Sequence, residues 1–267
     1  MALMAICSAK GSPGATVTAL ALTLTARRPV VLAECDPAGG DIAAGYLREV
    51  QLGQRGLGQL TASLHRGHLM EDFWGQLVDL APGSQTALTR LLLPGLADPF
   101  QAARWAEVRR PGDRSGWQQL ADLFIGDDTA ARYDVIADCG RLSAGFPPAA
   151  VLAAADVVLL VVRPTLPSMR AAAVGLGSLR GDDRPPVGLV VVGDRPYGTR
   201  EIAAQLGLEV VVTLPVDDAT ASVLSLGGIH NRGQLMRAAT RAHDLVWRLA
   251  VRATVPAVRP IEVSHVR

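Results

Sequence analysis

Short runs of apolar residues recur along this chain and alternate with longer stretches rich in Ala, Leu and Arg. Most short runs are continuously apolar, which is typical of strands buried on both faces of a sheet, and the longer stretches have helical length. The predicted strands span residues 3–8, 30–34, 87–93, 134–138, 156–162, 187–192 and 209–213. The predicted helices span residues 15–26, 42–50, 69–80, 101–109, 117–124, 167–179, 199–206 and 234–252.

Strands that alternate with helices are joined by right-handed crossovers into a mostly parallel sheet. We therefore expect an α/β fold, in which residues 1–253 form a single domain with a mostly parallel, twisted sheet and helices on both faces. Residues 51–84 contain glycine-rich turns and are predicted to be a variable excursion from the core. Pro256 and Pro260 break the last helix, so residues 254–267 are predicted to be a C-terminal tail.

The composition is that of a globular protein and excludes several other classes. Of the 267 residues, 49% are hydrophobic and 19% are charged, so the chain can bury a core and is not expected to be disordered. The net charge of +1 creates no global basic field for nucleic acid. The N-terminus lacks the basic segment of a signal peptide, and the longest apolar run, 151–162, is too short to cross a bilayer. Cys7, Cys35 and Cys139 lack the spacing of a zinc site, so buried free thiols in the cytoplasm are expected.

The junction after the first predicted strand carries the most specific signal for a ligand. In an open α/β sheet, ligands bind where the carboxyl ends of strands meet the N-termini of helices. Two glycines here allow the backbone N–H groups to turn inward, and a helix follows directly, which together form a cradle for phosphate. An ordinary βα turn explains the same residues, so the segment alone leaves both interpretations open. The segment consists of Lys10, Gly11, Ser12, Pro13, Gly14, Ala15, Thr16 and Val17.

This segment resembles the deviant Walker A loop of the MinD/ParA family, a group of P-loop ATPases of the SIMIBI class, whose pattern is KGGxGKT. Lys10 matches the signature lysine of that loop, and it is the only lysine of the chain. Ala15 departs from the pattern, because the family has there the ordinary Walker lysine that contacts the β- and γ-phosphates. The remaining matches are Gly11, Gly14 and Thr16, with Ser12 in place of the second glycine.

The next landmark follows the second predicted strand. Residues 34–41 resemble the DxDP motif of switch I in this family, with Glu34 in place of the first Asp and Asp36 as the second. The resemblance implies that Asp36 helps to position the attacking water near Mg²⁺. A turn rich in Asp, Pro and Gly is also a common feature of any βα loop.

A third landmark ends the strand predicted at 134–138. Residues 133–140 resemble the Walker B strand and switch II of the family. The resemblance implies that Thr16 coordinates Mg²⁺, that Asp138 holds it through water, and that Gly140 lets switch II follow the γ-phosphate. A strand ending in Asp is by itself a weak signal.

Two later segments resemble the family's loops beside the nucleotide base. Asp194 and Arg195 occupy the place of an Asn-Arg segment, and Pro215 and Asp217 belong to a segment similar to IPxD. A carboxylate accepts hydrogen bonds but donates none, so Asp194 leaves the preferred base open. Plain surface turns account for both segments equally well.

The last predicted helix has an apolar stripe and, on the opposite side, a basic one. The basic stripe has two interpretations: a solvated face of a packed helix, or a surface that binds DNA phosphates or anionic lipid. ParA-like proteins bind DNA, and MinD-like proteins bind membranes through a C-terminal amphipathic segment, which the tail after Pro256 does not resemble. We call the basic stripe the C-terminal basic strip; it consists of Arg237, Arg241, Arg248 and Arg252.

The resemblance spans roughly residues 2–253 and is closest to actinobacterial MinD-like proteins similar to CpaE and TadZ of pilus systems. It implies an ATP-dependent dimerisation switch, with ATP and Mg²⁺ as cofactors, that positions a cargo, a chromosome or plasmid, a septum, or a pilus or secretion machinery. In the nucleotide-bound homodimer Lys10 would reach the partner's phosphates, and an unidentified protein partner and a location at the nucleoid or membrane periphery are expected.

Ala15 makes weak ATPase activity the expectation and supports one alternative, a non-hydrolysing scaffold or adaptor on the same fold. The retained Thr16, Asp36 and Asp138 favour the switch instead, because an abandoned site need not keep its Mg²⁺ residues. A third interpretation, a small-molecule ATP-dependent enzyme similar to dethiobiotin synthetase, lacks a second cluster of substrate-binding residues in the sequence.

Overall fold

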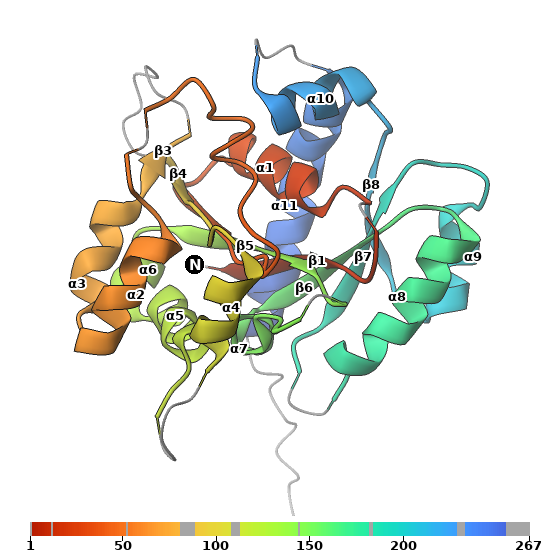
Figure 1. The fold of residues 1–267 in the computed structure, drawn as a ribbon. Coiled ribbons are helices and arrows are strands. Elements are labelled where there is room, and N and C mark those ends of the chain that lie inside the picture. The colour runs from red at the N-terminus through yellow and green to blue at the C-terminus, as the bar shows by residue number, and fades with distance from the viewer. Residues whose placement is uncertain are drawn as a thin grey trace, which may run out of the picture.

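The computed structural model describes residues 2–11, 13–51, 53–80, 89–107, 113–143, 145–181, 184–228 and 233–254. Eight strands within these residues form one sheet in the order β3-β4-β2-β5-β1-β6-β7-β8 (Figure 1). All pairs of neighbouring strands are parallel except β3 with β4, which confirms the predicted α/β fold with a mostly parallel sheet. The strands are β1 (Leu3–Ser8), β2 (Val30–Glu34), β3 (Val78–Asp79), β4 (Arg90–Leu93), β5 (Asp134–Arg141), β6 (Val157–Val162), β7 (Val187–Val192) and β8 (Val210–Leu214).

Helices cover both faces of the sheet because each central strand is apolar on both sides. In β1, Leu3 and Ala5 belong to the core of one face, and Met4 and Ile6 belong to the core of the other. The second of these faces is covered by α1 (Ala15–Leu24), α10 (Asp218–Leu226) and α11 (Gln234–Thr254). The first is covered by α2 (Leu57–Arg66), α3 (Leu69–Phe73), α4 (Pro99–Ala106), α5 (Gly116–Ile125), α7 (Ala149–Ala154), α8 (Leu166–Leu179) and α9 (Thr199–Leu206). Two short elements complete the described helices, η1 (Trp74–Gln76) and α6 (Asp127–Ala130).

The helix predicted at 42–50 is wrong, because this segment consists of hydrogen-bonded turns. Its backbone passes directly against α10: a Cβ on Gly45 would lie 2.1 Å from the carbonyl oxygen of Ser225. Gly45 N–H donates to the carbonyl of Asp41 at 2.8 Å, so the turns satisfy their own backbone while following the surface of α10.

The prediction that residues 51–84 form an excursion from the core is wrong for the residues of this range that the structure describes. Leu57, Leu60 and Phe73 are fully buried in the same cluster as the central strands. The single helix predicted at 69–80 ends at Phe73 and gives way to η1 and β3. Polar residues stand between these apolar positions in the sequence, so the apolar pattern did not predict that the segment packs on the sheet.

The C-terminal end of the domain is α11, which closes the second face of the sheet. The indole N–H of Trp247 donates to the buried carboxylate of Asp134 at 2.6 Å and fastens the helix to the start of β5. The predicted tail lies outside the described residues beyond Thr254. Among the helices that are described, none is both long and apolar enough to cross a membrane.

Candidate functional site

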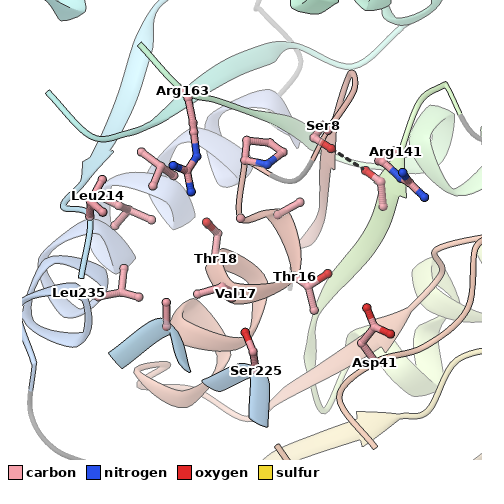
Figure 2. Close-up of a pocket in the computed structure, with 18 of the residues that line it drawn as sticks. Ser8, Thr16, Val17, Thr18, Asp41, Arg141, Arg163, Leu214, Ser225 and Leu235 are labelled. Atoms are coloured by element: carbon pink, nitrogen blue, oxygen red, sulfur yellow. Dashed lines mark hydrogen bonds between the residues drawn. The ribbon is translucent and has the colours of Figure 1, made fainter. Parts of the chain in front are cut away.

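A pocket of about 450 Å³ opens over the N-terminus of α1, where the carboxyl ends of the central parallel strands meet (Figure 2). This is the place where open α/β sheets bind ligands. Ser8 ends β1 at the pocket wall, and its hydroxyl donates a long hydrogen bond of 3.5 Å to the carbonyl of Gly140. The pocket brings together the predicted residues Gly11, Pro13, Gly14, Ala15, Thr16, Val17, Asp36, Gly140, Pro215 and Asp217.

The N-terminus of α1 is open toward this pocket. Gly14 is the N-cap residue, with φ +103° and no side-chain hydrogen bond to the first turn, and the first turn contains no acidic residue. A Cβ on Gly14 would meet no atom within 4 Å. The first backbone N–H groups of a helix have no partner inside the helix, and the helix dipole adds positive potential there. The arrangement is therefore a cradle for an anion such as phosphate. Ser12 lies outside the described residues.

Thr16, which lines the pocket, contacts Asp138 of β5. Asp138 is buried within this strand, where it accepts hydrogen bonds from the side chain of Thr16 and, at 3.1 Å, from the N–H of Gly140. The pKa of Asp138 is raised to about 6, chiefly by burial and also by the nearby carboxylates of Asp36 and Asp41, against the lowering effect of its hydrogen bonds.

Asp36 is held against the backbone of β5. Its carboxylate accepts the N–H of Ala38 at 2.7 Å, and a Cβ on Gly140 would lie 2.0 Å from its Cγ. Gly140 has φ +60° at an irregularity in the pairing of β1 with β5, so only a glycine admits Asp36 at this position. Burial raises the pKa of Asp36, while the Ala38 N–H and the Arg141 guanidinium lower it.

Glu34, which replaces the first Asp of the motif, has a structural role. Its buried carboxylate accepts the N–H of Ile42 at 2.8 Å and the N–H of Gly95 at 3.1 Å. It thus ties the loop after β2 to the loop after β4. Burial raises the pKa of Glu34 to about 7, despite these hydrogen bonds.

The carboxylates fit a magnesium site of the kind that retains several waters. The negative charges of Asp36 and Asp41 raise the pKa of Asp138, so a cation beside Asp138 would be stabilised. In the described part of the chain no three His, Cys, Asp or Glu side chains are placed to ligate one metal directly. Mg²⁺ is commonly bound by one or two protein oxygens together with waters and substrate phosphates, which matches Thr16 and Asp138.

Lys10 is exposed and is not among the residues that line the pocket above α1. It lines two other hollows, one with Val174 and Ser178 of α8, and one that adjoins the pocket beside Gly11 and Pro13.

The residues predicted to lie beside the nucleotide base occupy two different places in the structure. Asp194 and Arg195 line a hollow adjoining the main pocket, next to Val192 and Val216. Asp217 is the N-cap of α10: it accepts the N–H of Thr220 at 3.1 Å and the N–H of Leu235 at 3.1 Å. The Leu235 N–H is the main cause that lowers the pKa of Asp217. Its carboxylate thus joins α10 to α11, a role that the sequence did not indicate.

We expect Asp217→Ala to lower the free energy of unfolding by about 1–2 kcal/mol, the usual cost of losing an N-cap. Urea denaturation measures this effect. Asp218→Ala is the matched control, since Asp218 also lines the pocket but is exposed and is not the cap. Equal stability of the two variants would contradict the capping role.

Neither the protein-family models nor the curated protein sequences match this chain. Among solved structures, MinD of Aquifex aeolicus aligns with a TM-score of 0.69 at 17% identity, covering 93% of this chain and 98% of that one. A ParA-family ATPase from Chlorobium tepidum aligns with a TM-score of 0.68 at 16% identity, covering 90% and 97%. The septum site-determining protein MinD from Pyrococcus horikoshii, complexed with Mg-ADP, aligns with a TM-score of 0.67 at 15% identity, covering 94% and 97%.

The chain has the MinD/ParA fold. The likeness covers at least 90% of this chain and at least 97% of each of these three structures. At these identities the likeness concerns the fold, and the chemistry of the pocket has to be argued from its own residues.

Two arginines that line the pocket were not among the residues predicted from the sequence. Arg141 follows Gly140, and Arg163 directly follows β6; both line the pocket. A signal was present, because a charged residue that ends a buried parallel strand lies at the ligand-binding edge of the sheet. Only the strand order shows that β6 is a neighbour of β1.

The cysteines and the C-terminal basic strip of this MinD/ParA fold are placed as follows. Cys7, Cys35 and Cys139 are free, buried thiols at the ends of three adjacent strands, and burial raises the pKa of each thiol. In the strip, the three described side chains are exposed on α11, and the two nearer its start line a hollow together with Asp194. The side chain of Arg252 lies outside the described residues.

Proposed function

We propose that this chain is an ATP-dependent dimerisation switch of the MinD/ParA type that positions a cargo. The observation that carries the proposal is the open N-terminus of α1, with the hydrogen bond between Thr16 and Asp138 directly beside it. A helix N-terminus binds phosphate, and a Thr–Asp pair at the same place is suited to the Mg²⁺ that accompanies a nucleotide. The Mg-ADP complex of the Pyrococcus horikoshii protein supports this type of ligand for the fold.

The proposal gives separate roles to residues of the loop before α1, to Thr16 with Asp138, and to Asp36. The cradle of Gly11 and Gly14 binds the phosphates through backbone N–H groups. Thr16 and Asp138 would hold Mg²⁺, which when bound neutralises phosphate charge. Asp36, whose carboxylate accepts the N–H of Ala38 and lies against Gly140, would accept a hydrogen bond from the attacking water.

Titration calorimetry with ATP, ADP and GTP, with and without Mg²⁺, tests the proposal. We expect micromolar to millimolar affinity for a nucleotide that increases when Mg²⁺ is added, followed by slow phosphate release. The absence of heat with all three nucleotides would overturn the switch in favour of a scaffold.

A non-hydrolysing scaffold is the second candidate, and one observation favours it. Ala15 is buried at the first turn of α1 and supplies no charge to the phosphates. Loss of a charge-assisted hydrogen bond in such a site lowers affinity and turnover. The intact contact between Thr16 and Asp138 is the reason that we prefer the switch.

The proposed partners include duplex DNA or an anionic membrane surface at the C-terminal basic strip. Replacing its four arginines by Ala should remove binding to duplex DNA at low salt, measured by fluorescence anisotropy. For four phosphate contacts, the wild-type affinity should fall with a log–log salt slope of about −3 to −4. If wild-type protein binds neither DNA nor anionic vesicles, the strip is only a solvated face.

A control with the same change in charge is available. Four exposed arginines away from α11, Arg66, Arg104, Arg184 and Arg200, can be replaced by Ala together. Equal loss of DNA binding in this variant would show that net charge, and not the strip, determines binding.

A further inference from the structure

The pocket contains few positive charges for a ligand that carries several negative ones. Its acidic lining residues are Asp36, Asp41, Asp217 and Asp218, and its only basic lining residues in the described chain are Arg141 and Arg163. Ala15 contributes no charge, and Lys10 is not among the residues that line this pocket. Within the subunit, the two arginines are therefore the side chains of the pocket lining that offer positive charge to a polyphosphate.

Arg163 reaches the pocket from the strand next to the phosphate loop. It directly follows β6, in which Leu160 and Val161 pair with Cys7 and Ser8 of β1. Figure 2 shows its guanidinium extending from the end of β6 toward the first turns of α1, with Thr18 below it. It also lines the two adjoining hollows, one beside Gly11 and Pro13 and the other beside Asp194.

The backbone of Arg163 is anchored, while its guanidinium is available. Its N–H donates to the hydroxyl of Ser168 at 2.9 Å, and its carbonyl accepts the N–H of Thr165 at 2.8 Å. No carboxylate among the described residues forms an ion pair with its side chain. The anchored backbone fixes where the side chain starts, and the guanidinium needs to break no ion pair before it binds an anion.

Arg141 is differently engaged. It lies close enough to Asp36 to lower the pKa of that carboxyl group, and in Figure 2 its guanidinium points away from Arg163. Its positive charge is therefore partly balanced by switch I, which leaves Arg163 as the better candidate for the phosphates.

We propose that Arg163 binds the nucleotide polyphosphate and supplies, from β6, the positive charge that the ordinary Walker lysine would supply from the position of Ala15. This inference rests on the proposed nucleotide-binding function. A guanidinium forms two parallel hydrogen bonds with phosphate oxygens and stays charged at every physiological pH, so it substitutes for an ammonium group from another direction.

The first test compares ligands with different numbers of phosphates. In calorimetry, Arg163→Ala should weaken ATP and ADP binding about 10- to 100-fold, the usual effect of losing a hydrogen bond to a charged group. Adenosine binding should remain unchanged, because adenosine carries no phosphate. Arg200→Ala removes an exposed arginine of α9 that lines none of these pockets and should bind like wild type.

The second test asks whether a lysine at position 15 restores the ATP affinity that Arg163→Ala loses. In the Arg163→Ala background, Ala15→Lys should restore most of the lost ATP affinity, whereas a merely structural role of Arg163 would not respond to a lysine on α1. Melting temperatures of all variants check that the chains are folded.

The outcomes separate this inference from the proposed function. A wild-type chain that binds no nucleotide overturns both. A wild-type chain that binds ATP, with Arg163→Ala binding it equally well, overturns only the role of Arg163. Equal losses for ATP and adenosine, without rescue by Ala15→Lys, also overturn it, because Arg163 would then support the base or the fold.

Discussion

A single methyl group at Gly14 should abolish nucleotide binding without unfolding the chain. Gly14 has φ +103°, and a Cβ there would enter open space above α1, where the structure places no other atom within 4 Å. We infer that this space receives the phosphates, so Gly14→Ala should reduce ATP affinity by at least about 100-fold, through blocked approach to the backbone N–H groups. Calorimetry measures the affinity, and urea denaturation measures the stability.

Gly67 offers a matched control for the backbone strain. It has φ +76° at the C-cap of α2, and a Cβ there would also meet nothing within 4 Å, but it lies outside the pocket. Both substitutions force a side chain into a left-handed backbone, at a cost of about 1–2 kcal/mol. If Gly14→Ala binds ATP as well as Gly67→Ala does, phosphates do not bind at the start of α1.

The second large effect is expected at Lys10. We propose that this side chain, which does not line the pocket above α1, stabilises phosphate charge in a second subunit. Turnover should therefore be slow and second order in protein at low concentration. Lys10→Ala should lower turnover by about 100-fold or more, as the loss of one preorganised donor does. ATP binding by the monomer should be unchanged.

Two further variants complete this experiment. Arg170→Ala removes an exposed positive charge from α8, the helix beside Lys10, and should leave turnover near the wild-type value. Ala15→Lys should raise nucleotide affinity, because it restores the missing contact at the first turn. Unchanged turnover in Lys10→Ala together with unchanged binding in Ala15→Lys would mean that the loop is not a working ATPase loop, and the scaffold would then be the better description.

The sequence by itself determined the elements whose signal is local. The bounds of β1, β2, β7 and α9 were predicted to the residue, because buried β-branched runs and a glycine after a helix are contained in a few neighbouring positions. The loop proposed to bind phosphate could be recognised for the same reason: Gly11, Gly14 and Thr16 lie within six residues, and their geometry depends on one turn and one helix start.

The tertiary structure decided where distant segments meet. Residues 42–50 form turns because Gly45 passes against Ser225, far along the chain. The sequence predicted that Asp217 lies in a loop beside the nucleotide base. In the structure its carboxylate caps α10 and accepts a backbone N–H from the first turn of α11. In both cases the deciding contact comes from an element that no local pattern of apolar and polar residues specifies.

The positive charge of the pocket also depends on contacts between segments that are distant in the sequence. The resemblance of the loop implies that Ala15 replaces a lysine that contacts phosphate, but the sequence could not indicate which other side chain lines the same pocket. Arg163 lies about 150 residues further on and reaches the pocket only because β6 pairs with β1. Strand order depends on the packing of two helical layers on the whole sheet, so the fold, and not the sequence of residues 10–17, decided which side chains lie around this loop.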